Sequence, residues 1–197
     1  SPEIVRTVAS ALKRHGAKRI VLDPVLRATS GASLGGDDTA QAIIKELFPM
    51  ATLVTPNLEE ASLLLGRELV APEDFKLAAE ELLDMGPQAV LIKGGHLDAT
   101  HTQLTDFLMW RTMEEGLEVV QSKEFKHYRV NTANTHGTGC SLASAIAQVC
   151  HRDGVKIVGA GIGSAGPIDN AKGTINPVNI PHWVDFSLVD FVREVSG

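Results

Sequence analysis

The sequence predicts an α/β fold with a mostly parallel sheet and helices on both of its faces. Three short apolar runs, at residues 18–23, 51–55 and 88–93, are each followed by proline or glycine, as buried strands often are. Helical patterns lie between these runs. Strands that alternate with helices form parallel sheets with both faces covered.

The predicted helices begin and end at recognisable residues. The segment 2–15 is followed by Gly16, a favourable residue after a helix end. The segment 57–65 begins at Asn57, a favourable N-cap, and is followed by Gly66. Further helices are expected at 38–48 and 72–86, and further strands at 105–110 and 125–130.

Composition restricts the class of protein. The chain has 197 residues, of which 44% are hydrophobic and 21% charged, an ordinary globular balance. The net charge of −6 argues against nucleic acid or an anionic membrane as a partner. No apolar run approaches the ~20 residues of a membrane helix. The two cysteines, Cys140 and Cys150, are too few for a disulfide scaffold, so we expect a cytoplasmic protein, or an organellar one in a eukaryote.

The last quarter of the chain differs in composition. Residues 154–181 are rich in glycine, proline and asparagine, which predicts loop or tail. We expect the main domain at 1–153, with 154–197 as a C-terminal segment of the same domain. The run at 155–166 fits the spacing G-x-G-x-x-G, but Pro167 follows at once and no helical pattern continues, so a dinucleotide-binding loop is not expected.

Polar side chains lie at the ends of all three predicted parallel strands. Asp23 ends the first strand and Lys93 ends the third. Asn57 and Glu60 follow the second. Because parallel strands end at one edge of a sheet, we expect these side chains to converge there. The set suits a magnesium-bound nucleoside triphosphate, since carboxylates hold magnesium and a lysine neutralises charge on a transferring phosphoryl group.

The spacing of Asn57 and Glu60 has two interpretations. The two residues are three apart and reach the same side of the first turn of a helix. They could hold a metal ion with its waters, or they could form a capping box. The spacing by itself favours the capping box.

A glycine-rich turn precedes the last helical pattern. In the stretch NTHGTGCSLASAIA, the residues Gly137, Thr138, Gly139 and Cys140 stand directly before small apolar residues. The amides and dipole of a helix N-terminus hold phosphate groups. A thiol there ionises more readily, so Cys140 could be a base for a substrate hydroxyl, or it could be a small buried thiol.

Four segments together resemble one family. LDPVL, TPNLEEASLLLG, VLIKGGH and NTHGTGCSLASAIA occur in the order found in hydroxymethylpyrimidine/phosphomethylpyrimidine kinases of the ribokinase superfamily. The resemblance covers residues 1 to about 150. It implies an ATP-dependent phosphotransferase of thiamine biosynthesis, which phosphorylates hydroxymethylpyrimidine and then its monophosphate. It also implies the cofactors ATP and Mg²⁺ and a homodimer.

The resemblance assigns roles to individual residues. Each role below is implied by the family motif that the residue matches. Gly137, Thr138 and Gly139 form an anion hole with Cys140, and Cys140 is the catalytic base; Asn57 and Glu60 organise magnesium; Lys93 contacts the phosphates; Asp23 lies near the nucleotide phosphates; Val25 lines the pyrimidine pocket.

The sequence also departs from the family. Leu26 stands where methionine is usual, and nothing here matches the family's first strand and its N-terminal glycine-rich segment that binds the pyrimidine. We therefore expect the sequence to be part of a longer protein. Two alternatives stay open: a pyridoxal kinase of the same superfamily, which shares the turn and the cysteine, and a non-catalytic remnant that binds nucleotide or pyrimidine without turnover.

Overall fold

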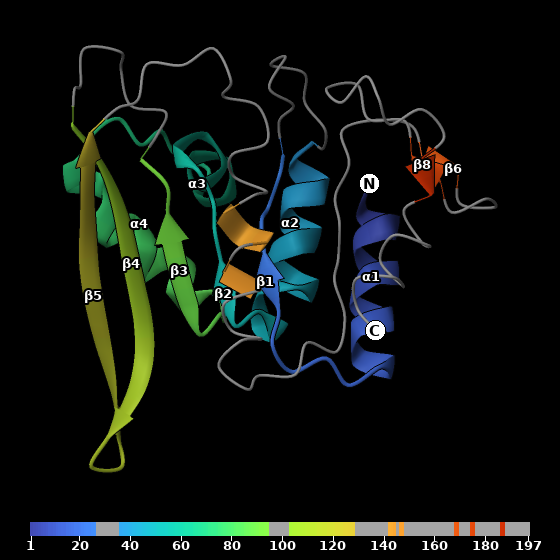
Figure 1. Ribbon diagram of the computed structural model, residues 1–197, viewed down its shortest axis with the longest axis horizontal. Helices are drawn as coiled ribbons and strands as arrows, with labels where there is room; N and C mark the ends of the chain where they lie inside the picture. The colour runs from blue at the N-terminus through green and yellow to red at the C-terminus, as the bar shows by residue number, and fades with distance from the viewer. Residues whose placement is uncertain are drawn as a thin grey trace. The chain divides into compact units, whose positions relative to one another are not determined.

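The computed structural model divides the chain into two compact units, Ser1–Val155 and Lys156–Gly197. The first unit contains a five-stranded sheet in the order β1-β2-β3-β4-β5 (Figure 1). The residues that the structure describes are 1–26, 36–94, 103–128, 142–144, 146–147, 168–169, 174–175 and 186–187.

The first three strands of the sheet are parallel. They are β1 (Val21–Leu22), β2 (Leu53–Val54) and β3 (Ala89–Ile92). Leu22 pairs with Val54, and Val54 pairs with Val90. The prediction of parallel strands from the three apolar runs is therefore confirmed. Val54, Val90 and Ile92 are completely buried, as a strand covered on both faces requires.

The other two strands form one long antiparallel hairpin. Strand β4 (Gln103–Glu114) pairs with β3 and with β5 (Leu117–Tyr128), and Figure 1 shows the hairpin extending well beyond β3. The strand expected at 105–110 lies within β4, and residues 125–128 of the segment expected at 125–130 form the end of β5 that pairs with it. The part of the hairpin near its turn, residues 111–124, is more polar and largely exposed. It therefore lacks the apolar alternation that would have identified it as strand from the sequence.

The hairpin turns at two residues with left-handed backbone. Glu115 has φ 51° and Gly116 has φ 82°. Positive φ at both central residues is the pattern of a type I′ turn, whose twist matches that of the flanking strands. Glycine adopts this conformation freely, whereas glutamate does so at a cost.

The helices agree with the predicted segments and differ mainly at their ends. A short 3-10 turn that contains proline follows one of the predicted helices and opens another. The bounds are α1 (Pro2–Arg14), α2 (Asp37–Glu46), η1 (Phe48–Met50), α3 (Leu58–Leu65), η2 (Pro72–Asp74) and α4 (Phe75–Asp84).

One hydrophobic core joins these elements. Helix α4 packs on β3 and β4, and α1 packs on α2 (Figure 1). Phe48 and Phe75 are completely buried and belong to this core. Large aromatic side chains of this kind contribute ~3–5 kcal/mol each when truncation to alanine is measured. The core thus anchors the sheet whose strand ends form the site below.

The second unit contains a small antiparallel sheet in the order β6-β7-β8. Its strands are β6 (Ile168–Asp169), β7 (Thr174–Ile175) and β8 (Phe186–Ser187). The sequence predicted loop or tail here, because two-residue strands are too short to produce a recognisable period. The domain limits at 153 and 154 stay a prediction.

No helix in the described part of the chain combines the length and the apolar character that a membrane crossing requires.

Candidate functional site

The ends of the three parallel strands bring Asp23, Thr55 and Lys93 together. The Lys93 ammonium donates a hydrogen bond to Asp23 Oδ1 at 2.8 Å, and the Thr55 hydroxyl donates to the same oxygen at 2.9 Å. The side chains of Lys93 and Asp23 are each 13% exposed. These contacts exist because β1, β2 and β3 are neighbours and end at the same edge of the sheet.

Among the described residues, the two oxygens of Asp23 have different hydrogen-bond partners. Both of these hydrogen bonds fall on Oδ1, and within the described residues none falls on Oδ2. A carboxylate can accept up to about four hydrogen bonds, so Oδ2 is able to take a further partner. Thr55 is completely buried, and its hydroxyl therefore fixes the carboxylate from the inner side.

Thr55 is a site residue that the sequence reasoning missed. The sequence feature that could have indicated it is a polar residue at the end of an otherwise apolar strand, one position before Pro56. A completely buried hydroxyl needs a hydrogen-bond partner, and only the three-dimensional arrangement identifies that partner as Asp23.

Asn57 and Glu60 form a capping box at the start of α3. The Glu60 amide donates to Asn57 Oδ1 at 2.8 Å, and the Asn57 amide donates to Glu60 Oε2 at 2.8 Å. The capping interpretation of this pair is therefore confirmed. Asn57 also forms a parallel bridge with Lys93, and the Lys93 amide donates to the Pro56 carbonyl at 2.9 Å. The start of α3 is thus held directly beside the lysine.

Glu60 is a buried carboxyl group with an altered acidity. Glu60 is only 3% exposed. This burial raises the pKa of its carboxyl group from the ordinary 4.5 to about 7. The bond from the Asn57 amide and the charge of Lys93 lower the pKa, whereas the charges of Asp23 and Glu59 raise it further. Near neutral pH, a positive charge placed close to Glu60 would favour its ionised form.

The residues present fit a magnesium ion of the kind that binds together with a nucleotide. Mg²⁺ commonly uses one or two carboxylates and completes its shell with waters and substrate phosphates. Among the described residues, no group of three or more histidine, cysteine, aspartate or glutamate side chains could hold a metal alone. Asp23, with its second oxygen, and buried Glu60 are the carboxylates that could contribute.

The remaining predicted site residues lie partly outside the described structure. Val25 is described: it is 39% exposed, and its amide donates to the Asp23 carbonyl at 2.9 Å. It therefore lies at the same strand end and offers an apolar surface to solvent. The proposed turn and base, Gly137, Thr138, Gly139 and Cys140, lie outside the described residues.

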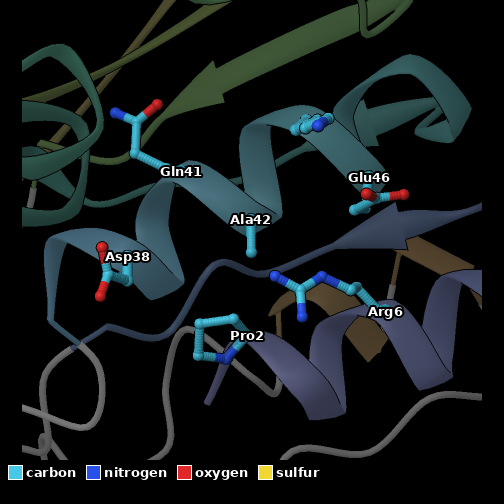
Figure 2. A pocket seen from close by; sticks show the side chains of 7 residues that line it. Pro2, Arg6, Asp38, Gln41, Ala42 and Glu46 are labelled. Atoms are coloured by element: carbon cyan, nitrogen blue, oxygen red, sulfur yellow. The ribbon is translucent and has the colours of Figure 1, made fainter.

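A separate hollow lies between α1 and α2, as Figure 2 shows. It has a volume of about 340 Å³, and none of the strand-end residues lines it. Its charges are mixed, since Arg6 and Lys45 face the hollow together with Asp38 and Glu46. Because the lining carries both positive and negative side chains, it does not favour a ligand of either charge. The strand ends therefore remain the candidate site.

The fold and the strand-end site define an α/β protein with the ribokinase-like fold. Pyridoxal kinase from Staphylococcus aureus in complex with AMP-PCP and pyridoxal is similar, with 30% identity and a TM-score of 0.62 over 79% of this chain and 54% of that chain. Phosphomethylpyrimidine kinase from Clostridium difficile 630 is similar with 28% identity and a TM-score of 0.51, over 79% of this chain and 65% of that chain.

The family follows from the sequence comparison. A family model described as phosphomethylpyrimidine kinase matches residues 1–155, and the chain belongs to this family. The hydroxymethylpyrimidine/phosphomethylpyrimidine kinase of Rhizobium meliloti is 42% identical over 146 residues, which is 74% of this chain and 51% of that protein. The chain therefore spans about half the length of this relative.

Proposed function

We propose that this protein transfers the terminal phosphoryl group of ATP to hydroxymethylpyrimidine and then to its monophosphate, in thiamine biosynthesis. The observation that carries the proposal is the Lys93–Asp23 pair beside the capped start of α3, in a chain of the phosphomethylpyrimidine kinase family. A cation beside two carboxylates supports this proposal, because a magnesium–nucleotide complex is bound by groups of both kinds.

Lys93 is proposed to stabilise the phosphoryl group as it moves. Its ammonium is held by Asp23, so its side chain is largely ordered before the nucleotide arrives. A nucleotide phosphate would share the ammonium with Asp23, since an ammonium has three donors. A group fixed in advance stabilises developing charge more effectively than one that must reorganise during the reaction.

Asp23 and Glu60 are proposed to hold Mg²⁺, which would neutralise charge on the ATP phosphates when bound. Glu60 would then act as an ionised carboxylate, because a nearby cation lowers the pKa of a buried acid. Its capping bond to the Asn57 amide would keep the carboxylate oriented. Asn57 supports the proposal in this indirect way, by fixing Glu60.

The glycine turn and Cys140 complete the proposed mechanism. The amides at Gly137, Thr138 and Gly139 would hold the transferring phosphoryl group. The hydroxymethyl oxygen would attack the γ-phosphorus while its proton passes to the Cys140 thiolate. The bond from phosphorus to ADP would break, and ADP would leave with the electron pair. Val25 would contribute an apolar wall to the pyrimidine pocket.

Pyridoxal kinase activity is the second candidate. The structural likeness to a pyridoxal kinase, with its TM-score of 0.62, favours it. Both reactions phosphorylate a hydroxymethyl group on a nitrogen heterocycle, so the same strand-end residues would serve either substrate.

The test is magnesium-dependent ADP release from ATP with hydroxymethylpyrimidine, its monophosphate or pyridoxal. We expect turnover on both pyrimidines, a loss of ~100-fold or more in Lys93→Ala and Cys140→Ala, and no loss in the control Lys76→Ala, whose lysine is exposed on α4. Turnover on pyridoxal alone would replace the first proposal by the second. Tight nucleotide binding without ADP release would indicate a non-catalytic protein.

Two further proposals concern assembly and location. The family resemblance supports a homodimer, which sedimentation analysis would test. A low cysteine content supports a cytoplasmic location, which fractionation of the source cells would test.

A further inference from the structure

The backbone after Lys93 leaves the β3–β4 ladder in an unusual way. The last pair of that ladder joins Ile92 with Phe107, so continued pairing would place Gly94 opposite Thr105. The Gly94 amide instead donates to the side chain of Asp106, at 2.8 Å from Oδ1. A carboxylate on the neighbouring strand thus takes a backbone amide that a strand carbonyl would otherwise accept.

Only glycine fits at this position. The carbonyl oxygen of Thr105 lies within the space that a Cβ atom on Gly94 would fill, and Phe75 closes the same space at 3.3 Å. The close approach of the two backbones is what brings the Gly94 amide to the Asp106 carboxylate. Gly94 and Asp106 therefore form one backbone-to-side-chain hydrogen bond at the end of β3, and this bond depends on the close approach.

The hydrogen bond between Gly94 and Asp106 fixes the backbone on one side of Lys93, and the segment that follows β2 fixes the other side. The Lys93 amide is held by the Pro56 carbonyl at 2.9 Å. The next amide, that of Gly94, is held by Asp106. With both flanking peptide planes anchored, the φ and ψ angles of Lys93 are restricted, and the direction of its side chain is set before any ligand binds.

We propose that Asp106 is a positioning residue that acts through Lys93 on the transferring phosphoryl group. The inference rests on the proposed function of Lys93. Asp106 keeps the peptide after Lys93 in place, while Asp23 holds the ammonium at the other end of the same residue. A hydrogen bond to an ionised acceptor is about twice as strong as a neutral one, which suits a carboxylate in this role.

The experiment compares Asp106→Ala, Asp106→Asn, Lys93→Ala and the double variant Asp106→Ala/Lys93→Ala. Both MgATP binding and ADP release are measured on the full chain. We expect Asp106→Ala to lower kcat by ~10- to 100-fold with little change in the KM for ATP, because a small misplacement of a positioned group has effects of this size. Asparagine keeps an acceptor oxygen, so Asp106→Asn should remain within about threefold of wild type. The control is Asp84→Ala, which removes an aspartate whose side chain is 78% exposed.

The double variant separates positioning from a merely structural role. If Asp106 acts through Lys93, removing both costs no more than removing Lys93 alone. Losses that multiply, or an Asp106→Ala protein as active as wild type beside an impaired Lys93→Ala, would overturn the inference. If Asp106→Ala does not fold, a folded Asp106→Asn with a tenfold loss would overturn it equally. A Lys93→Ala protein equal to wild type, or a wild-type chain that neither binds MgATP nor releases ADP, would instead refute the proposed function, and this inference with it.

Discussion

The buried carboxyl of Glu60 makes the stability of the protein depend on pH in a defined direction. Burial raises the pKa of Glu60 to about 7 in the folded protein, against 4.5 for the ordinary group. Substitution by glutamine removes the titration but keeps an oxygen that can accept the Asn57 amide of the capping box. The variant Glu60→Gln therefore separates the charge of this side chain from its capping role.

The sign follows from counting protons in the two states. Between about pH 4.5 and about pH 7, folded Glu60 keeps a proton that the unfolded chain has lost, so the free energy of unfolding falls as the pH rises. The contribution is favourable below the unfolded pKa and is lost as the pH passes through the folded pKa. Each pKa unit corresponds to about 1.36 kcal/mol, so the total loss across this window is ~3 kcal/mol.

The assay is urea unfolding of the magnesium-free protein between about pH 4 and about pH 8, followed by circular dichroism. Wild type and Glu60→Gln should have similar stability at the acidic end, and the variant should gain up to ~3 kcal/mol over wild type at the alkaline end. Glu80→Gln, which alters an exposed glutamate on α4, should show no such change. If the difference between wild type and Glu60→Gln stays constant across this range, the reasoning about burial is refuted.

Magnesium extends the same experiment to the proposed metal site. If Glu60 helps to hold Mg²⁺, the added ion should stabilise wild type near pH 8, and Glu60→Gln should respond less, because ligands that bind only the folded state raise its stability. An equal response of the two proteins would exclude Glu60 from the metal site while leaving the pH result intact.

Three further substitutions test other parts of the structure by urea unfolding. Gly94→Ala should destabilise by at least ~2 kcal/mol, because a Cβ would meet the Thr105 carbonyl; an unchanged midpoint would contradict the close approach. Glu115→Asn should stabilise by ~0.5–1 kcal/mol, since asparagine tolerates the left-handed conformation that the hairpin turn requires, and a loss of stability would argue against a type I′ turn. Thr55→Val should cost ~1 kcal/mol, because the Asp23 carboxylate loses a buried donor, and a neutral result would show that this bond contributes little.

The sequence by itself determined the local features and the family. Helix ends, the capping box of Asn57 and Glu60, and the strands ended by proline or glycine depend on residues close together in the chain, so their patterns are legible without a structure. The family followed from four motifs, and the family model matches residues 1–155. The roles of Cys140 and of the glycine turn stay predictions.

The tertiary structure decided which residues far apart in the chain donate hydrogen bonds to the same acceptor atom. Lys93 and Thr55 are 70 and 32 residues from Asp23 in the chain, yet both donate to one of its oxygens. The pKa of Glu60 likewise depends on burial under other elements, which no local spacing reveals. Two further features depend on the tertiary structure. They are the continuous register of the β4–β5 hairpin and the hydrogen bond that the Gly94 amide donates to Asp106 in place of a strand carbonyl. Local patterns depend on backbone geometry within a few residues, whereas these contacts depend on how the sheet and its helices pack together.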